Sequence, residues 1–455
     1  MRFWTHDVAA ATGGTLMGPD VALDGVSFDS RTVRHGELFV PIVAERDGHD
    51  FIVNALERGA AAYLTAHAPQ GGTAVVVSDT LQALMDLATA LRRSQVTATI
   101  IGITGSVGKT STKDLAWAAL AASRRTWANE RSFNNDQGLP TTLLNAPDDT
   151  EVMVLEMGMR GFGEIARLCR IAAPRIGVVT RVAEAHSDRV GGINGVAKAK
   201  VELIEALPAD GVAVLNGDDP RVRAMRGRGG GSALLFGEGA DVDVRITDVV
   251  LDELARASFT LHTPWGSVPV QLGVSGRHMA LNAAAALACV GVLGADLEAG
   301  AAALAEVNLT AMRMEVVRTT SGAIVLNDCY NANPTSMRAA IDALAALPAT
   351  RRVAVVGVMA EISDPELEHP AIVRYAEERG VEVVATGTAL YGIEPVADAA
   401  DVLGSLAGGD AVLVKASRAA GLERVAARIV ERCGGVFVGE GAEGSTGHIA
   451  PPRQA

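Results

Sequence analysis

Apolar runs and one-sided amphipathic stretches alternate along the chain, and their order predicts three segments. In residues 1–95, short β-like runs at 38–43 and 73–77 precede a stretch in which the leucines from Leu81 to Leu91 recur with a helical period. This segment is therefore expected to form a small α/β unit that ends in a helix with one apolar face.

Residues 96–308 alternate more regularly between β-rich runs and helical patterns, which is typical of a mainly parallel sheet covered by helices. The predicted strands are residues 99–103, 152–155, 176–180 and 212–215. A glycine-rich stretch, residues 227–232, is expected to be a surface loop. The β-like runs after it, residues 242–246, 259–262 and 268–272, suggest an antiparallel addition.

A third segment, residues 309–455, alternates again, with β-rich runs at 324–326, 353–356, 381–386 and 411–414. The residues from Glu443 onward are expected to be a disordered tail. The whole pattern predicts an α/β protein of three domains.

Composition agrees with this division, because 455 residues suffice for about three domains of ~150 residues each. A hydrophobic fraction of 49% with 20% charged residues is typical of a soluble globular protein. The four scattered cysteines favour a reducing compartment, and neither a signal-peptide core nor a membrane-spanning run is present, so a cytoplasmic location without membrane insertion is expected. A net charge of -13 argues against nucleic acid as a partner.

A candidate phosphate-binding loop follows the first strand of the middle segment. It reads Thr-Gly-Ser-Val-Gly-Lys-Thr at residues 104–110 and opens a helical pattern. Small residues let the backbone N–H groups face an anion, while Lys109 adds a charge and Thr110 a hydroxyl for magnesium. Strict P-loop spacing would require glycine at Ile103, so this is a variant. Its position between strand and helix favours nucleotide binding over an ordinary turn.

Candidate metal ligands follow the next two strands. Glu156 and His186 each come after a strand, and ligands of open α/β sheets gather at that edge. A surface glutamate and a structural histidine are the plainer interpretations. Residues 195–204 are expected to form an amphipathic helix that carries Lys198 and Lys200, both of which also suit a solvated face.

Together, these motifs resemble the Mur ligases of peptidoglycan synthesis. The residues that carry the resemblance are 104–110, 134–140, 156–158, His186, 199–202 and 215–219. Residues 327–336, Asn-Asp-Cys-Tyr-Asn-Ala-Asn-Pro-Thr-Ser, resemble the signature of the family member that joins D-alanyl-D-alanine to UDP-N-acetylmuramoyl-tripeptide. The motifs at 29–33, 36–40 and 48–50 are similar to the family's UDP-sugar module. The resemblance covers nearly the whole chain in the expected order.

The resemblance implies a UDP-sugar-binding α/β domain at residues 1–95 and a central P-loop-type, ATP-binding ligase domain at 96–308. A Rossmann-like domain at 309–455 would bind the incoming dipeptide. It also implies a cytoplasmic enzyme of cell wall biogenesis, needed for cell shape and division, which we expect to be a monomer. ATP would phosphorylate the terminal carboxylate of the UDP-linked peptide, and the dipeptide amine would attack the acyl phosphate.

The resemblance further assigns site residues. Those expected to act in catalysis are Lys109, Lys200, His186 and Asn135. Those expected to bind ATP are Gly105, Ser106, Val107, Gly108, Lys109, Thr110, Ser111, Asn282, Arg313 and Asp328. Thr110 and Glu156 would hold one Mg²⁺, His186 would be a ligand of a second, and a carbamylated Lys200 would be a further metal ligand. Lys198 is the competing candidate for the carbamate, and His278 shares a helix face with Asn282.

For the substrates, the resemblance assigns Ser30 and Arg31 to the UDP-linked peptide, and Asn331, Asn333 and Ser336 to the dipeptide. The last three also suit an ordinary turn in which Pro334 starts a helix. The late motif at 415–418 is expected near the same cleft. Four residues depart from the family pattern: Arg181, Met279, Asn327 and Cys329. The alternatives are another Mur-type amide ligase or secondary-pathway paralogue with a different substrate, and a nucleotide-binding regulatory module without turnover.

Overall fold

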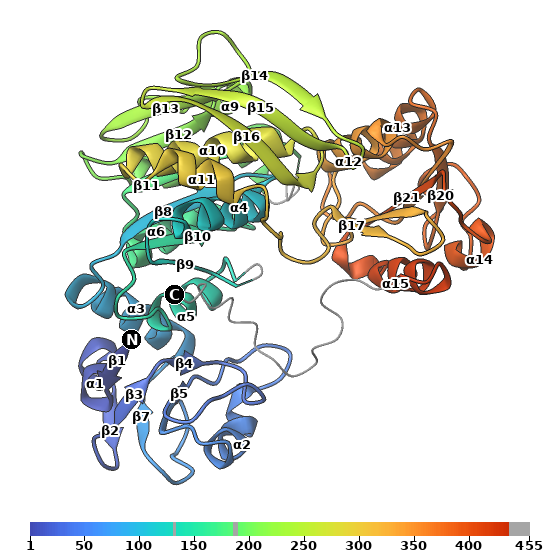
Figure 1. Cartoon of the computed structure of the whole chain (residues 1–455). Coiled ribbons are helices and arrows are strands. Elements are labelled where there is room, and N and C mark those ends of the chain that lie inside the picture. Colours follow the sequence, from blue (N-terminus) through green and yellow to red (C-terminus); the bar gives the residue numbers. More distant parts are fainter. Residues whose placement is uncertain (131–132, 185–189, 436–455) are drawn as a thin grey trace.

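The computed structural model describes residues 1–130, 133–184 and 190–435. Three large sheets, each with its own helices, lie in separate parts of the molecule (Figure 1). His186 and the predicted tail from Glu443 lie outside the described residues. In the described part of the chain, no helix is both long and apolar enough to span a bilayer.

The N-terminal part contains a five-stranded sheet in the order β2-β7-β6-β5-β4 and a separate β1-β3 pair. The strands are β1 (Arg2–Trp4), β2 (Thr15–Met17), β3 (Ala22–Asp24), β4 (Val26–Ser27), β5 (Leu38–Phe39), β6 (Ala62–Thr65) and β7 (Ala74–Val76). The helices are α1 (Thr5–Thr12), α2 (Ile52–Glu57) and α3 (Thr80–Ser94), with a 3₁₀ turn at Gly48–Phe51. The predicted run at 38–43 keeps only two residues as a strand, because Pro41 has no N–H to donate to a sheet.

The predicted one-sided helix is α3. Asp79 caps it by accepting hydrogen bonds from the N–H groups of Leu81 and Gln82. Its buried face includes Leu84 and Leu91 and contacts helices α1, α5 and α6, so this helix joins the N-terminal sheet to the central part of the molecule.

The central part is built on a nine-stranded sheet in the order β16-β15-β14-β13-β12-β11-β8-β10-β9. Its strands are β8 (Thr99–Thr104), β9 (Thr126–Ala128), β10 (Val152–Glu156), β11 (Ile176–Val179), β12 (Val212–Asn216), β13 (Ser232–Gly237), β14 (Val244–Leu251), β15 (Arg256–Thr263) and β16 (Gly266–Ser275). The four predicted parallel strands are confirmed, and their aliphatic runs are buried as in other sheets covered on both faces. The antiparallel addition, β14 to β16, is also confirmed. Strand β13 was not predicted.

The helices of the central part are α4 (Lys109–Ala121), α5 (Gly138–Leu144), α6 (Glu164–Ala172), α8 (Ile193–Glu205), α9 (Pro220–Arg223), α10 (Met279–Val292) and α11 (Leu297–Ala303). The alanine-rich α10 packs against α4, because small side chains let two helices approach closely.

The C-terminal part has a five-stranded sheet in the order β17-β18-β21-β19-β20, in which only β17 is antiparallel. Its strands are β17 (Glu315–Arg318), β18 (Ile324–Asn327), β19 (Arg351–Val356), β20 (Glu382–Ala385) and β21 (Asp410–Lys415). The helices are α12 (Pro334–Ala346), α13 (Pro365–Glu377), α14 (Ala399–Leu403) and α15 (Glu423–Arg432), with a 3₁₀ turn at Arg418–Ala420. The four predicted strands of this segment are confirmed.

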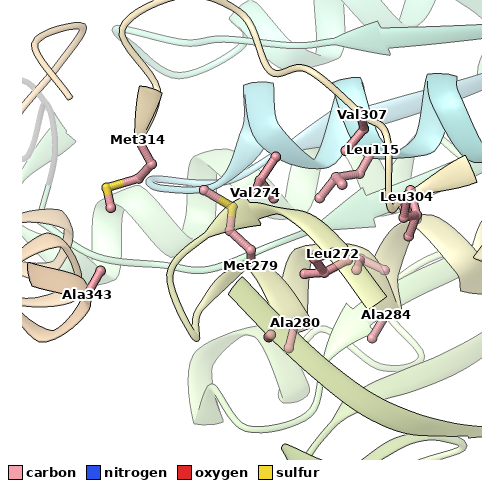
Figure 2. Close-up of a cluster of buried hydrophobic side chains, with 14 of the residues drawn as sticks. Leu115, Leu272, Val274, Met279, Ala280, Ala284, Leu304, Val307, Met314 and Ala343 are labelled. Carbon is pink, nitrogen blue, oxygen red and sulfur yellow. The ribbon is translucent and has the colours of Figure 1, made fainter. Parts of the chain in front are cut away.

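One hydrophobic cluster continues from the central part into the C-terminal part (Figure 2). It includes Leu115 of α4 and Leu272 of β16, and extends through Met279 and Met314 to Ala343 of α12. The two parts therefore share buried apolar surface where the chain passes from one to the other.

Candidate active site

The predicted phosphate loop connects β8 to α4. Gly108 precedes the first helical residue, Lys109, with a φ of 84°, a left-handed conformation that favours glycine. A Cβ atom on Gly105 would lie 1.9 Å from the Thr180 hydroxyl oxygen, so this position is restricted to glycine by contact as well. The strand-loop-helix context expected for a phosphate cradle is confirmed.

Gly108→Ala is expected to lower the free energy of unfolding by about 1–2 kcal/mol, the cost of a left-handed conformation in a residue with a Cβ atom. The added carbon would also meet the Asn282 Oδ1 atom at 2.7 Å, so we expect weaker nucleotide binding. Urea unfolding and ADP titration would measure both effects. Gly13→Ala is the matched control, because Gly13 has a φ of 65° with open space around it; it should lose stability but keep nucleotide affinity.

A buried carboxylate lies beside this loop. Glu156, the last residue of β10, is 1% exposed. Its Oε2 accepts a hydrogen bond from the Thr110 hydroxyl at 2.7 Å, and its Oε1 accepts one from the Asn134 amide at 2.6 Å. Arg313 donates to the same Thr110 hydroxyl at 3.0 Å. The structure therefore brings together Thr110, Glu156 and Arg313, which come from three distant stretches of the sequence.

Two lysines lie near this carboxylate. Burial lowers the pKa of Lys109, and Arg313 acts in the same direction while Glu156 opposes it. Lys200 is 4% exposed, and burial, followed by the charge of Lys109, holds its pKa well below the usual range. Within the described part of the chain, the Lys200 amine makes no hydrogen bond. Lys198, two residues away on α8, is exposed and lies 5.6 Å from the centre of the Phe162 ring.

The residues predicted to lie near the adenine and the ribose of ATP come from α10, from the position just before it and from the position just after β18. Asn282 of α10 lies against Gly108, and its amide donates to the Met279 sulfur at 3.4 Å. Met279, which departs from the family pattern, therefore directly contacts the residue that is predicted to bind adenine. Burial lowers the pKa of His278, which precedes α10. Asp328 forms a buried ion pair with Lys415, with 2.5 Å between Oδ2 and Nζ. The sequence assigned no individual role to Lys415.

Arg313, which belongs to the C-terminal part of the molecule, contacts the phosphate loop. Its guanidinium lies 3.9 Å from the centre of the Tyr330 ring, while one of its nitrogens reaches Thr110. An arginine held in this way presents a fixed positive charge to a phosphate.

Asn135, which is predicted to act in catalysis, and its neighbour Asn134 make different contacts. Its side-chain oxygen accepts hydrogen bonds from the N–H groups of Gln137 and Gly138 and so caps α5. Asn134, to which no role was assigned, is the one that contacts Glu156. Asn129 also went unrecognised; its amide oxygen accepts the Glu156 N–H at 2.9 Å. The catalytic role of Asn135 stays a prediction.

The predicted substrate residues lie in two parts of the molecule. In the N-terminal part, Ser30 is buried, while the exposed Arg31 is paired with Asp29 at 2.7 Å. In the C-terminal part, the Asn331 carbonyl accepts a hydrogen bond from Lys415 at 2.8 Å. Roles for these residues in substrate binding stay predictions.

Asn333 and Ser336 form a reciprocal capping box at the start of α12. The Asn333 side chain accepts the Ser336 N–H at 2.9 Å, and the Ser336 hydroxyl accepts the Asn333 N–H at 3.1 Å. Their predicted role in binding the dipeptide stays untested beside this structural role.

Because of this cap, Asn333→Ala is expected to lower the free energy of unfolding by about 1 kcal/mol. Asn333→Asp should retain the stability, since aspartate caps a helix equally well. Urea denaturation of both variants would measure the effect. Unchanged stability in Asn333→Ala, with a raised KM for the dipeptide, would instead assign the residue to recognition.

Three side chains of the kinds that bind metal ions lie close together in the N-terminal part, within the predicted UDP-sugar module. One ligand atom each from Asp47, His49 and His67 lies within 4.8 Å of the others. Both ring nitrogens of His49 are already used, because Nδ1 lies 2.6 Å from Asp47 and Nε2 accepts the Ala66 N–H at 3.1 Å. His49 therefore connects the Asp47 turn to the end of β6.

Comparison with known proteins gives the class of this chain: it belongs to the Mur ligase family. The Mur ligase middle domain matches residues 103–290, and the Mur ligase glutamate ligase domain matches residues 312–438. Within that family, the chain is similar to UDP-N-acetylmuramoyl-tripeptide--D-alanyl-D-alanine ligases. It is 40% identical to the one from Mycobacterium tuberculosis, over 90% of this chain and 93% of the relative. It is 37% identical to the one from Bacillus subtilis, over 79% of each.

Solved structures give the same answer. MurF from Acinetobacter baumannii matches with a TM-score of 0.86 and 28% identity, over 95% of this chain and 99% of that one. MurF ligase from Thermotoga maritima in complex with ADP matches with a TM-score of 0.80 and 28% identity, over 90% and 97%. The predicted family and the predicted α/β fold class are thereby confirmed.

Proposed function

We infer that this chain is an ATP-dependent ligase that joins D-alanyl-D-alanine to UDP-N-acetylmuramoyl-tripeptide, a step in making the peptidoglycan precursor. The similarity to curated ligases of this reaction extends over nearly the whole chain. The observation that carries the proposal is the contact of Arg313 with the phosphate loop. Arg313, from the C-terminal part, donates to the Thr110 hydroxyl, and this hydroxyl donates to the buried Glu156 carboxylate.

The reaction proceeds in two steps. A carboxylate oxygen of the UDP-linked peptide attacks the γ-phosphorus of ATP, and ADP leaves with the electrons of the broken P–O bond. The dipeptide amine then attacks the acyl carbon of the resulting acyl phosphate, inorganic phosphate leaves, and the nitrogen gives up its proton to form a neutral amide. Lys109, the loop amides and Arg313 stabilise the negative charge that spreads over the transferred phosphoryl group.

The residues around Glu156 suit a magnesium ion. A buried carboxylate beside the Thr110 hydroxyl offers the oxygen ligands that this hard cation prefers, and we assign one Mg²⁺ to Thr110 and Glu156. His186 is assigned to a second Mg²⁺, and Lys200, once carbamylated, is a further metal ligand. When bound, Mg²⁺ neutralises phosphate charge. The Lys200 amine is buried and, in the described structure, makes no hydrogen bond. Its lowered pKa favours the neutral form that reacts with carbon dioxide, and the resulting carbamate is an anionic oxygen ligand.

The remaining assignments rest on the likeness to the family. ATP binding to Gly105, Ser106, Val107, Gly108, Ser111, Asn282 and Asp328 rests on the family pattern, as do the cytoplasmic location and the monomeric state. Ser30 and Arg31 are assigned to the UDP-linked peptide, and Asn331 to the dipeptide.

The test is incubation with ATP, UDP-N-acetylmuramoyl-tripeptide and a panel of dipeptides, followed by mass measurement of the products. We expect phosphate release only when the UDP-linked peptide and D-alanyl-D-alanine are both present, with a product that contains both. A product formed preferentially with another amine or another carboxylate would identify a different Mur-type ligase. ATP hydrolysis that is indifferent to both substrates would indicate a regulatory nucleotide-binding module.

A further inference from the structure

The two residues that flank Arg313 have a left-handed backbone. Met312 has a φ of 61° and Met314 a φ of 49°. Such values are uncommon for residues other than glycine, because the Cβ atom then lies too close to the following carbonyl oxygen. A backbone of this kind persists only where surrounding contacts impose it, and such positions are frequent at functional sites.

Contacts within the C-terminal part hold this segment on both sides of Arg313. The Met312 N–H donates to the Glu315 carboxylate at 3.3 Å, and the Met312 carbonyl accepts the Tyr330 N–H at 3.3 Å. On the other side, the Met314 N–H donates to the Asp328 carboxylate at 3.2 Å. The backbone before and after Arg313 is therefore fixed to the start of β17 and to the segment that follows β18.

The Arg313 side chain is held differently from its backbone. One guanidinium nitrogen donates to the Thr110 hydroxyl at 3.0 Å, but the buried Nε atom has no hydrogen-bond partner among the described residues. The Tyr330 ring, 3.9 Å away, lies against the guanidinium. An aromatic ring in this position restricts the orientation of the guanidinium and leaves its N–H groups able to donate to an anion.

Tyr330 thus contacts this segment twice, through its ring at Arg313 and through its N–H at Met312. We propose that Tyr330 is a positioning residue, which keeps the charge of Arg313 directed at the phosphate loop. The inference rests on the proposed function, which places Arg313 at the transferred phosphoryl group. It gives a part in the reaction to a residue of the motif at 327–336 to which the sequence assigned no individual role.

The test is a double-mutant cycle on ligation with Tyr330→Leu, Arg313→Gln and the variant that carries both. Tyr330→Leu is expected to lower kcat about tenfold, the scale of a partly buried contact between a cation and a ring. Arg313→Gln should lower kcat about a hundredfold. If Tyr330 acts through Arg313, Tyr330→Leu should change kcat less than twofold once Arg313 is replaced.

A tenfold loss from Tyr330→Leu in both backgrounds would overturn the proposal, because the two residues would then act independently. An unchanged kcat with a raised KM for the dipeptide would overturn it as well and assign Tyr330 to the dipeptide. Tyr330→Phe keeps the ring and the backbone N–H, so it should retain most of the wild-type kcat. A tenfold loss in Tyr330→Phe would place the effect in the hydroxyl and contradict the role of the ring.

Tyr375→Leu is the matched control. Tyr375 lies on α13 in the C-terminal part, and its ring centre is 3.4 Å from the Arg379 guanidinium, so the variant loses the same kind of contact elsewhere. Its kcat should equal that of the wild type. A tenfold loss in Tyr375→Leu would show that any weakened C-terminal part lowers kcat, and the proposal would fail.

A second measurement, which needs no substrate, tests the backbone at Met312. Met312→Gly and Met312→Ala both lose the sulfur that the Arg418 guanidinium contacts, so the comparison isolates the left-handed conformation. Met312→Gly should have the higher urea midpoint, because glycine has no Cβ atom to clash. Equal midpoints would overturn the proposed hold on this segment. A wild type that ligates no dipeptide would refute the proposed function instead, so the two failures are distinguishable.

Discussion

Lys109→Met is expected to lower kcat for ligation by about a thousandfold, the scale seen when a charged group that stabilises a transferred phosphoryl is removed. Lys109 is the first residue of α4, and its ammonium donates to the Gly105 carbonyl at 2.8 Å, so the loop itself holds the charge at the centre of the phosphate cradle. Methionine keeps the length and the apolar stem of the side chain but removes the charge. The effect should therefore fall on catalysis rather than on folding.

The measurement is phosphate release with ATP, UDP-N-acetylmuramoyl-tripeptide and D-alanyl-D-alanine, alongside thermal unfolding of the same variant. Lys198→Met is a suitable control, because that lysine is exposed on α8 and its loss should leave both kcat and the melting temperature unchanged. Turnover of Lys109→Met near the wild-type rate, in a protein that melts normally, would remove the phosphate loop from the mechanism.

The sequence predicts the centre of this site well, because its geometry follows from strand order. Glu156 pairs in register with Ile103 in adjacent parallel strands, so the carboxylate necessarily emerges beside the loop that starts at Thr104. Aliphatic runs identify such strands, and a glycine-rich turn before a helix identifies the loop. Placement at one sheet edge is a property of topology, and topology is visible in the pattern.

The sequence pattern does not show in which direction a side chain points in the loop that follows a strand. Asn134 and Asn135 are adjacent and chemically identical, yet one contacts Glu156 and the other caps α5. Asn333 likewise fits both a cap and a ligand by residue type. These choices depend on loop conformation and on contacts from distant segments. The same holds for the Asp328–Lys415 pair, whose members are separated by most of the C-terminal segment.

The side chains that meet between the central and C-terminal parts also lie beyond the reach of sequence patterns. Arg181 and Arg221 follow different strands of the central sheet, and Arg338 lies on α12 in the C-terminal part. Asp218 and Asp219 accept backbone N–H groups, and Glu368 pairs with Arg338; no local motif specifies these contacts.

Lys200→Ala is expected to lower kcat about a hundredfold or more, because it removes the group proposed to become an anionic magnesium ligand; changes in groups that support a metal commonly cost activity on this scale. Lys200 lies in a low-dielectric position near Lys109 and Glu156, where burial depresses its pKa and favours the neutral amine. A small anion can occupy the space that the shortened side chain leaves. Added bicarbonate or chloride should therefore restore part of the lost activity.

A direct readout separates the carbamate from a merely structural lysine. Wild-type protein equilibrated with isotopically labelled bicarbonate should show one carbamate carbon signal by NMR, and Lys200→Ala should lack it. Lys198→Ala should retain both the signal and the activity, since that lysine is exposed on α8 and lies over the Phe162 ring. Normal turnover in Lys200→Ala, with no gain from bicarbonate or chloride, would show that the carbamate assignment is wrong. A signal that disappears in Lys198→Ala instead would transfer the modification to the exposed lysine.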